Sequence, residues 1–234
     1  MDRMSNRFAY HAEQAIAAQG EFIRRVYNWM GLGLATTAIV SLVTASNPAL
    51  INVIFGTGLF WVLFIAELAL VWVLSAAINR LQAATAAIMF FVYSGLNGLT
   101  LSIIFLVYTK ASIASTFFVT AGTFGVMSLY GYTTKKDLTS WGSFLFMGLI
   151  GIVLASVVNI FFNSPTIYWL VTYAGIIIFV GLTAYDTQSI KAMALQGFEN
   201  AEMETKGAVI GALQLYLDFI NLFLMLLRIF GRRD

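Results

Sequence analysis

Residues 215–231 read LYLDFINLFLMLLRIFG, a run of large apolar side chains with one carboxylate, Asp218, near its start. The run is long enough to form most of a helix that crosses a lipid bilayer, whose apolar core takes about 20 helical residues. A charged side chain at such a depth is costly and usually faces the interior of a helix bundle. The stretch therefore predicts a membrane-spanning helix that presents Asp218 to other helices.

The composition of the whole chain is typical of a membrane protein. Of its 234 residues, 60% are hydrophobic and 10% are charged, whereas soluble domains carry about 25% charged residues. There is no cysteine, which excludes disulfides and thiolate metal sites, and the single histidine, His11, lies in the N-terminal tail. The net charge of +2 is diffuse, with no basic block of the kind found in nucleic-acid-binding proteins. We expect the lipid bilayer as the surroundings, no nucleic acid partner and no cofactor.

Seven apolar segments are long enough to span a bilayer, and the hydrogen-bonding needs of the backbone in lipid require helices there. We place these spans at about 26–46, 56–78, 82–108, 112–132, 142–163, 165–188 and 207–230. A polar loop, residues 189–206, is expected between the last two. The prediction is an all-α polytopic membrane protein. It has an N-terminal tail, residues 1–25, and a single seven-helix domain, residues 26–234.

The distribution of lysine and arginine orients the chain in the membrane. With a cytosolic N-terminus, the cytosolic segments hold nine of the thirteen basic residues, and the other side holds Lys110 and three arginines near the C-terminus. The basic C-terminal end leaves two alternatives, a last helix that crosses or one that dips in and returns, and we favour crossing. Brief tails without organelle-retention signals indicate a bacterial inner (cytoplasmic) membrane.

Three acidic residues fall inside the predicted spans: Glu67, Asp186 and Asp218. At 100° per residue, the strongly polar residues of the last span gather in one stripe about 100° wide, which includes Gln214, Asp218 and Asn221. The remaining circumference is mainly apolar, with Tyr216 as the most polar exception. The last helix is therefore predicted to lie at the centre of the bundle, with this polar stripe towards other helices.

The sixth and seventh spans run antiparallel, so Asp186 and Asp218 reach the same depth if the sixth helix continues past Lys191. Two carboxylates within hydrogen-bonding range cannot both ionise cheaply, and such a pair shares a proton and changes charge near neutral pH. It would join two helices when singly protonated, and repel them or bind a hard cation such as Ca²⁺ when fully ionised. A proton-coupled site is equally compatible with the sequence.

Three motifs resemble those of the Bax inhibitor family, also called the transmembrane Bax-inhibitor-motif family. The stretch 215–231 is similar to the signature of its last helix. GLTAYDTQSIK, residues 181–191, resembles its sixth-helix motif, and GYTTKKDLTS, residues 131–140, resembles the turn after its fourth helix. The resemblance implies a seven-helix bundle whose last helix is surrounded by the other six. It also implies that Asp186 and Asp218 form a di-aspartyl pH sensor.

The resemblance further implies a calcium-leak activity, in which the protonation of the pair decides whether the second helix seals or opens the path. Ca²⁺ would be the transported ion, with Asp186 and Asp218 as its candidate ligands. Glu67 matches an acidic position in the second helix of some members and is a candidate for lining the path. The family pattern also places an arginine near the end of that helix, as a latch for an aspartate. Ile78 occupies the corresponding position here, and Arg80 is the nearest candidate.

Uncharged polar residues complete the candidate set. Gln214 and Asn221 belong to the polar stripe and could line the ion path together with Glu67. Asn97 is expected to bridge helices by hydrogen bonds, and lining the path is the alternative for it.

The sequence thus favours a pH-sensitive calcium leak channel and leaves two alternatives open. One is a regulatory inner-membrane protein that binds a membrane-anchored ATP-dependent protease, as the resemblance to bacterial relatives suggests. The other is an H⁺/cation exchanger, although neither an inverted repeat nor a pair of broken helices is visible. An enzyme is not expected, because the sequence shows no nucleophile–base set, metal cluster or phosphate loop. The Gly-x-Gly-Asp context of intramembrane aspartyl proteases is absent at both aspartates.

Overall fold

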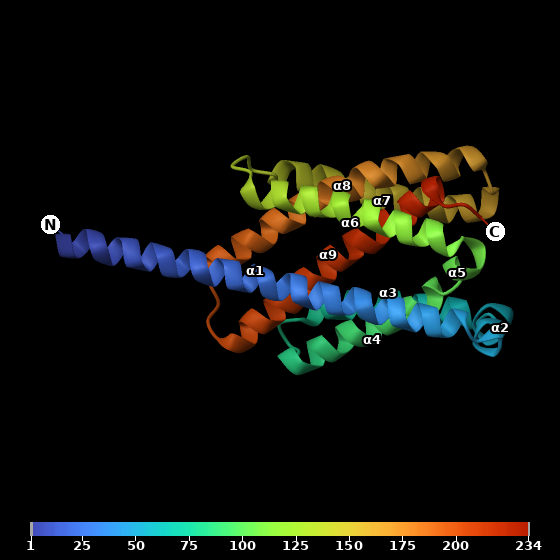
Figure 1. Cartoon of the computed structure of the whole chain (residues 1–234), viewed down its shortest axis with the longest axis horizontal. Helices are drawn as coiled ribbons and strands as arrows, with labels where there is room; N and C mark the ends of the chain where they lie inside the picture. The colour runs from blue at the N-terminus through green and yellow to red at the C-terminus, as the bar shows by residue number, and fades with distance from the viewer. Residues whose placement is uncertain (1, 234) are drawn as a thin grey trace.

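The computed structural model describes residues 2–233, and their side chains from residue 17 onward. The chain is an assembly of helices (Figure 1). They are α1 (Asp2–Ala45), α2 (Pro48–Gly56), α3 (Leu59–Ala77), α4 (Ala83–Leu101), α5 (Ile104–Val107), α6 (Lys110–Thr133), α7 (Thr139–Phe162), α8 (Pro165–Gln196) and α9 (Ala201–Phe230). In this described part, seven segments are long and apolar enough to cross a membrane, and each overlaps one predicted span. The predicted fold class is confirmed.

Local sequence explains where several helices begin and end. The Asn47 side chain caps α2 by accepting hydrogen bonds from two backbone amides of its first turn. Asn163, with φ 47°, ends α7 in the left-handed conformation that asparagine tolerates. Ser164 then caps α8 by accepting a hydrogen bond from the Ile167 amide, and Pro165 occupies the first helical position. The Asn163-Ser164-Pro165 stretch therefore makes the tight turn between α7 and α8.

The polar segment 189–206 is mostly helical, and its prediction as a loop was wrong. α8 continues to Gln196, and only residues 197–200 separate it from α9. Gly197, with φ 74°, ends α8, and the Asn200 side chain caps α9 by accepting from the Met203 amide. Hydropathy marks only the apolar middle of these helices, which extend past it. The continuation of the sixth helix beyond Lys191 is confirmed.

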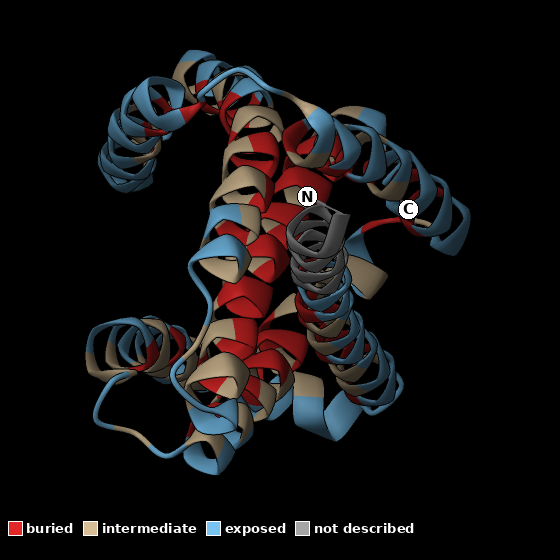
Figure 2. Ribbon diagram, turned by 90° about the vertical axis from the view of Figure 1, so that its left-hand side faces the viewer, coloured by how far each residue is buried: buried red, intermediate tan, exposed pale blue. Residues whose placement is uncertain are grey.

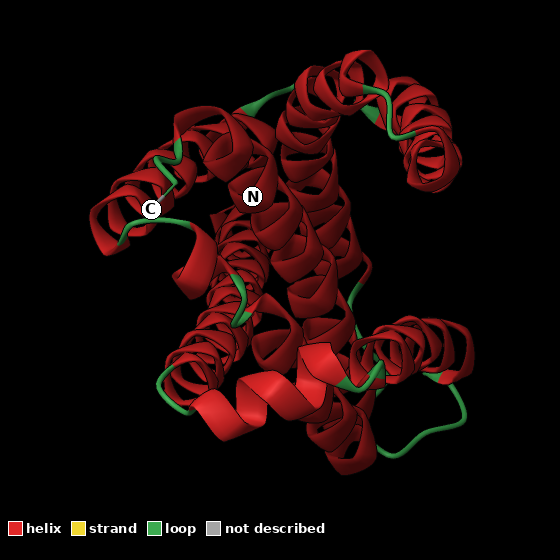
Figure 3. Ribbon diagram, turned by 90° about the vertical axis from the view of Figure 1, so that its right-hand side faces the viewer, coloured by secondary structure: helices red, strands yellow, loops and turns green. Residues whose placement is uncertain are grey.

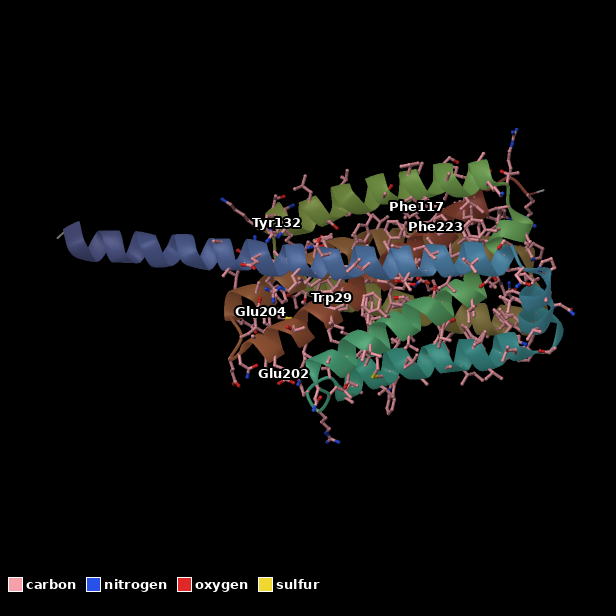
Figure 4. All side chains as sticks on the ribbon, turned by 60° about the horizontal axis from the view of Figure 1, so that its bottom comes forward. Trp29, Phe117, Tyr132, Glu202, Glu204 and Phe223 are labelled. Carbon is pink, nitrogen blue, oxygen red and sulfur yellow. The ribbon has the colours of Figure 1, made fainter. Side chains whose placement is uncertain are left out.

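α9 lies at the centre of the bundle. Of its most apolar 18-residue window, 72% is buried, against 44% at most for the other spans. Figure 2 shows the buried residues concentrated along the middle of the bundle. Phe117 of α6 and Phe223 of α9 illustrate this packing, with ring centroids 6.3 Å apart (Figure 4). The predicted central position is confirmed.

The extensive contacts of α9 are made with four helices, α1, α4, α6 and α8, and not with all six other spans. α3 packs mainly on α4, and α7 packs on α8. The end-on view of Figure 3 shows these outer helices standing away from the centre. The resemblance implied that all six other helices surround the last one, and this was wrong for α3 and α7. One side of α9 therefore has no helix packed against it.

α9 runs from the end of the bundle from which α1 projects to the opposite end (Figure 1), so the last helix crosses it. The C-terminal segment is held beside α6, because the Thr109 amide donates to the Arg232 carbonyl at 3.0 Å and the Arg232 amide donates to Ser112 Oγ at 3.0 Å. At the other end, α1 runs through residue 25 without a break, and Phe22 is buried at 2% exposure. Residue 1 and the side chains of residues 2–16, His11 among them, lie outside the described part.

Candidate functional site

A cavity of about 890 Å³ lies beside the uncovered side of α9. Its walls are α9, α7 and α8, with Phe64 from α3. The α9 residues that line it are Gln214, Leu217, Asp218, Asn221, Met225 and Arg228. This set contains the polar stripe predicted from the sequence. The stripe faces a cavity, because neither α3 nor α7 packs extensively on α9.

Asp186 of α8 and Asp218 of α9 both line this cavity, and their carboxyl groups lie within hydrogen-bonding range of each other. Asp218 is buried, with 4% of its surface exposed, and Asp186 is half-buried. Asp218 Oδ2 has no hydrogen-bond partner among the described residues. Two ionised carboxylates can only accept hydrogen bonds, so one proton between them would supply a bond that neither can otherwise make.

Glycines let α6 and α7 approach α8 at the level of Asp186. A Cβ atom on Gly131 of α6 would overlap the backbone of Ala184, and one on Gly142 of α7 would overlap the ring of Tyr185. These close approaches hold the segment that carries Asp186 between its two neighbours.

The turn between α6 and α7 is fastened to α8 just beyond Asp186. Gln188 Oε1 accepts from the Leu138 amide at 2.8 Å, and Gln188 Nε2 donates to the Lys136 carbonyl at 2.8 Å. Lys191 Nζ donates to the Tyr132 carbonyl at 2.8 Å. The motifs GYTTKKDLTS and GLTAYDTQSIK, far apart in sequence, are thus in direct contact.

Asp137 shapes the same turn. Its Oδ1 accepts from the Thr139 amide at 2.8 Å at the start of α7. Hydrogen bonds from the Thr139 side chain and backbone lower the pKa of Asp137, which is fully exposed in the loop. Its ionised form therefore supports the first turn of α7.

Glu67 and Asn97 belong to a second polar cluster that does not line the cavity. Glu67, 7% exposed, accepts from Thr100 Oγ1 at 2.9 Å and from Asn97 Nδ2 at 3.2 Å. Asn97 makes the expected bridge between helices, here α3 and α4. Phe64, one turn before Glu67, is the α3 residue on the cavity wall. A place for Glu67 and Asn97 in an ion path stays a prediction.

The other candidates divide in the same way. Gln214 and Asn221 line the cavity, and Asn221 Nδ2 donates to the Leu217 carbonyl at 2.8 Å. Arg80 is exposed in the turn after α3, which ends at Ala77, and makes no ion pair with the described side chains, residues 17–233. The latch is therefore not formed in this conformation, because the turn carries Arg80 beyond the end of the helix.

Two residues gained importance only from the structure. Tyr216 is fully buried on the side of α9 away from Asp218, with its hydroxyl 2.6 Å from Thr37 Oγ1. Arg228 lines the cavity at the last turn of α9, and its guanidinium lies 5.1 Å from the ring centre of Tyr168. The sequence did contain a sign of the role of Tyr216, because its hydroxyl lies on the apolar side of the last helix. A tyrosine buried there usually forms a hydrogen bond with a polar partner.

The carboxyl pair is a sparse ligand set for a metal ion. No cluster of three or more acidic, histidine or cysteine side chains that could hold a metal occurs in the described part of the chain. Ca²⁺ takes six to eight oxygen ligands, so Asp186 and Asp218 would leave most positions to water or other groups.

These features define a polytopic seven-helix membrane protein with one buried and one half-buried carboxyl group on a cavity beside its central helix. The family model described as "Inhibitor of apoptosis-promoting Bax1" matches residues 19–234. The inner membrane protein YbhL of Escherichia coli is 56% identical over 214 residues, which cover 91% of this chain and 92% of that protein. A protein of Borreliella burgdorferi is 44% identical over 222 residues, with 94% and 96% covered. The protein RP147 of Rickettsia prowazekii is 44% identical over 213 residues, with 91% and 89% covered.

The chain belongs to the Bax inhibitor family. This confirms the resemblance carried by the three motifs.

Proposed function

We propose that this protein is a pH-sensitive calcium leak channel of a bacterial inner membrane, gated by protonation of Asp186 and Asp218. The observation that carries the proposal is the meeting of two carboxyl groups from α8 and α9 on one cavity, inside a bundle long enough to span a membrane. Membership of the Bax inhibitor family supports the proposed activity, and the name of the relative YbhL, an inner membrane protein, supports the proposed location. The excess of basic residues near the N-terminal end of the bundle supports a cytosolic N-terminus.

The gate would work through the charge of the pair. With one proton present, Asp186 and Asp218 share a hydrogen bond that holds α8 to α9. With none, two like charges face each other, and unit charges 4 Å apart at an effective dielectric constant of 20 repel by about 4 kcal/mol. A free energy of that size shifts a two-state equilibrium of packed helices by several hundredfold or more.

Ca²⁺ is the cation that hard oxygen ligands favour, and it would neutralise the ionised pair. Gln214 and Asn221, on the same cavity wall, offer amide oxygens along the path. α3 is the element best placed to move, because it packs mainly on α4 and contributes only Phe64 to the cavity. A shift of α3 would alter access to the pair with little disturbance of α9.

The experiment is Ca²⁺ entry into dye-loaded liposomes that contain the purified protein, measured from pH 5 to pH 8. We expect flux that changes with pH, and a flattened pH profile for Asp186→Asn and for Asp218→Asn. Glu199→Gln is the matched control, because Glu199 is exposed in the turn between α8 and α9. Flux and pH profile unaltered in both aspartate variants would refute the proposal.

The same preparation separates a leak from an exchanger, which would use the same carboxylates. In a leak, Ca²⁺ entry proceeds without a proton gradient and moves no protons in return. A fixed ratio of protons released to Ca²⁺ taken up, reported by a second dye, would instead establish exchange.

A further inference from the structure

The cavity beside α9 has an elongated shape. On α9 its lining runs from Gln214 to Arg228, and on α7 from Gly142 to Ile160. The α9 stretch rises over fourteen residue steps and the α7 stretch over eighteen, which at 1.5 Å per step gives about 21 Å and about 27 Å. Both lengths exceed the depth of one leaflet of the apolar core, about 15 Å. The cavity is therefore a groove that runs along the helices.

The groove opens laterally, towards the surrounding bilayer. Its α7 wall carries side chains that are about half exposed on the outside of the bundle, such as Phe146 (59%) and Val153 (53%). α3, the nearest helix across from α7, makes no extensive contact with it. The lining is mostly apolar, and its charged groups are Asp186, Asp218 and Arg228. A chain from the surrounding bilayer could enter between α3 and α7.

Arg228 stands at the C-terminal end of this groove. Its guanidinium lies over the Tyr168 ring, and its one described side-chain hydrogen bond goes to Met225 Sδ at 3.8 Å. No carboxylate among the described side chains, residues 17–233, pairs with it. Tyr168 and its neighbour Trp169 stack edge to face at 5.5 Å, the kind of aromatic residues that sit at the headgroup level of a membrane. A guanidinium fork at that level matches a phosphate group.

We propose that this groove is a phospholipid site, with the lipid phosphate on Arg228 and one acyl chain along the α7 and α9 walls. A phospholipid matches three features of the groove at once. Its phosphate matches the charge of Arg228, its acyl chain matches the apolar walls, and it can enter from the bilayer between α3 and α7. The acyl chain would pass Asp218, so the lipid belongs to the closed state and has to leave or shift before Ca²⁺ reaches the carboxyl pair.

The test is native mass spectrometry of the purified full chain in mild detergent with added dioleoyl phosphatidylglycerol. We expect a retained lipid, and a loss of affinity of at least about tenfold in Arg228→Gln, because a hydrogen-bonded charge pair is removed. Arg232→Gln is the matched control, since Arg232 is an exposed arginine four residues away whose side chain does not line the groove. Dioleoylglycerol, which has the same chains without phosphate, should bind as weakly as phosphatidylglycerol does to Arg228→Gln.

The apolar half of the site has its own variant. Val153→Trp fills the groove and should abolish retention, whereas Ile150→Trp, similarly exposed on α7 but outside the lining, should not. Gel filtration and helical circular dichroism check the fold of each variant. If Arg228→Gln does not fold, Arg228→Lys replaces it and should show an intermediate loss. Equal retention by native protein, the tested Arg228 variant and Val153→Trp would overturn the proposal. Complete loss of the lipid on addition of inorganic phosphate would also overturn the proposal, because binding would then come from the anion contact with Arg228 and not from the acyl chain.

Discussion

The contact between Tyr216 and Thr37 leads to a prediction in which one substitution rescues another. The two hydroxyl oxygens are 2.6 Å apart, and both residues are buried. Thr37 Oγ1 also lies 2.8 Å from the Ser94 carbonyl and 3.1 Å from the Gly33 carbonyl, which can only accept. Because Thr37 has one hydroxyl hydrogen and gives it to a carbonyl, Tyr216 must be the donor in its bond to Thr37.

This assignment makes the two single variants unequal. Tyr216→Phe removes one hydrogen bond and leaves Thr37 its carbonyl partner, at a cost of about 1 kcal/mol in unfolding free energy. Thr37→Val removes the bond to Ser94 as well and leaves the buried Tyr216 hydroxyl without an acceptor, at a cost of about 2–3 kcal/mol. The double variant has no orphaned hydroxyl and should be more stable than Thr37→Val alone.

The unfolding free energy can be measured in mixed micelles by titration with a denaturing detergent, followed by circular dichroism. Thr36→Val is the control, because Thr36 Oγ1 donates to the Leu32 carbonyl of its own helix on the exposed side of α1. Its effect should stay within about 0.5 kcal/mol. The reasoning fails if Tyr216→Phe costs as much as Thr37→Val, or if the cost of the double variant equals the sum of the singles.

Two further predictions concern the packing and the turn near Asp186. Gly131→Ala should destabilise the bundle by about 1–3 kcal/mol, because its Cβ would overlap the backbone of α8. A Cβ atom on Gly125 would meet open space, and alanine favours a helix more than glycine does. Gly125→Ala should therefore stabilise the bundle by up to about 1 kcal/mol. The lowered pKa of Asp137 means that its contribution to stability is present above the unfolded-state pKa near 3.9 and is lost as pH falls through the lower folded-state pKa. The difference in melting temperature between native protein and Asp137→Asn should therefore be constant from pH 5 to pH 8 and shrink progressively as pH falls below about 4, and a difference that does not shrink there would contradict this.

Sequence by itself determined the number of spans, their order and the central place of the last one. The physical reason is the bilayer, which sets a minimum length for an apolar helix and makes a lone polar stripe face away from lipid. Helix periodicity also placed Asp218, Gln214 and Asn221 on one side of α9. Hydropathy could not find the true ends of α8 and α9, because their polar turns continue the same helices outside the apolar spans.

Only the tertiary structure decided what each polar face meets. The stripe of α9 faces a cavity because α3 and α7 pack elsewhere. Glu67 turns to Asn97 and Thr100, away from that cavity, because those donors lie on the neighbouring α4. A sequence gives the angle and depth of a side chain on its own helix. The neighbour that lies opposite depends on how all the helices pack, since in lipid close packing and hydrogen bonds between helices decide their arrangement.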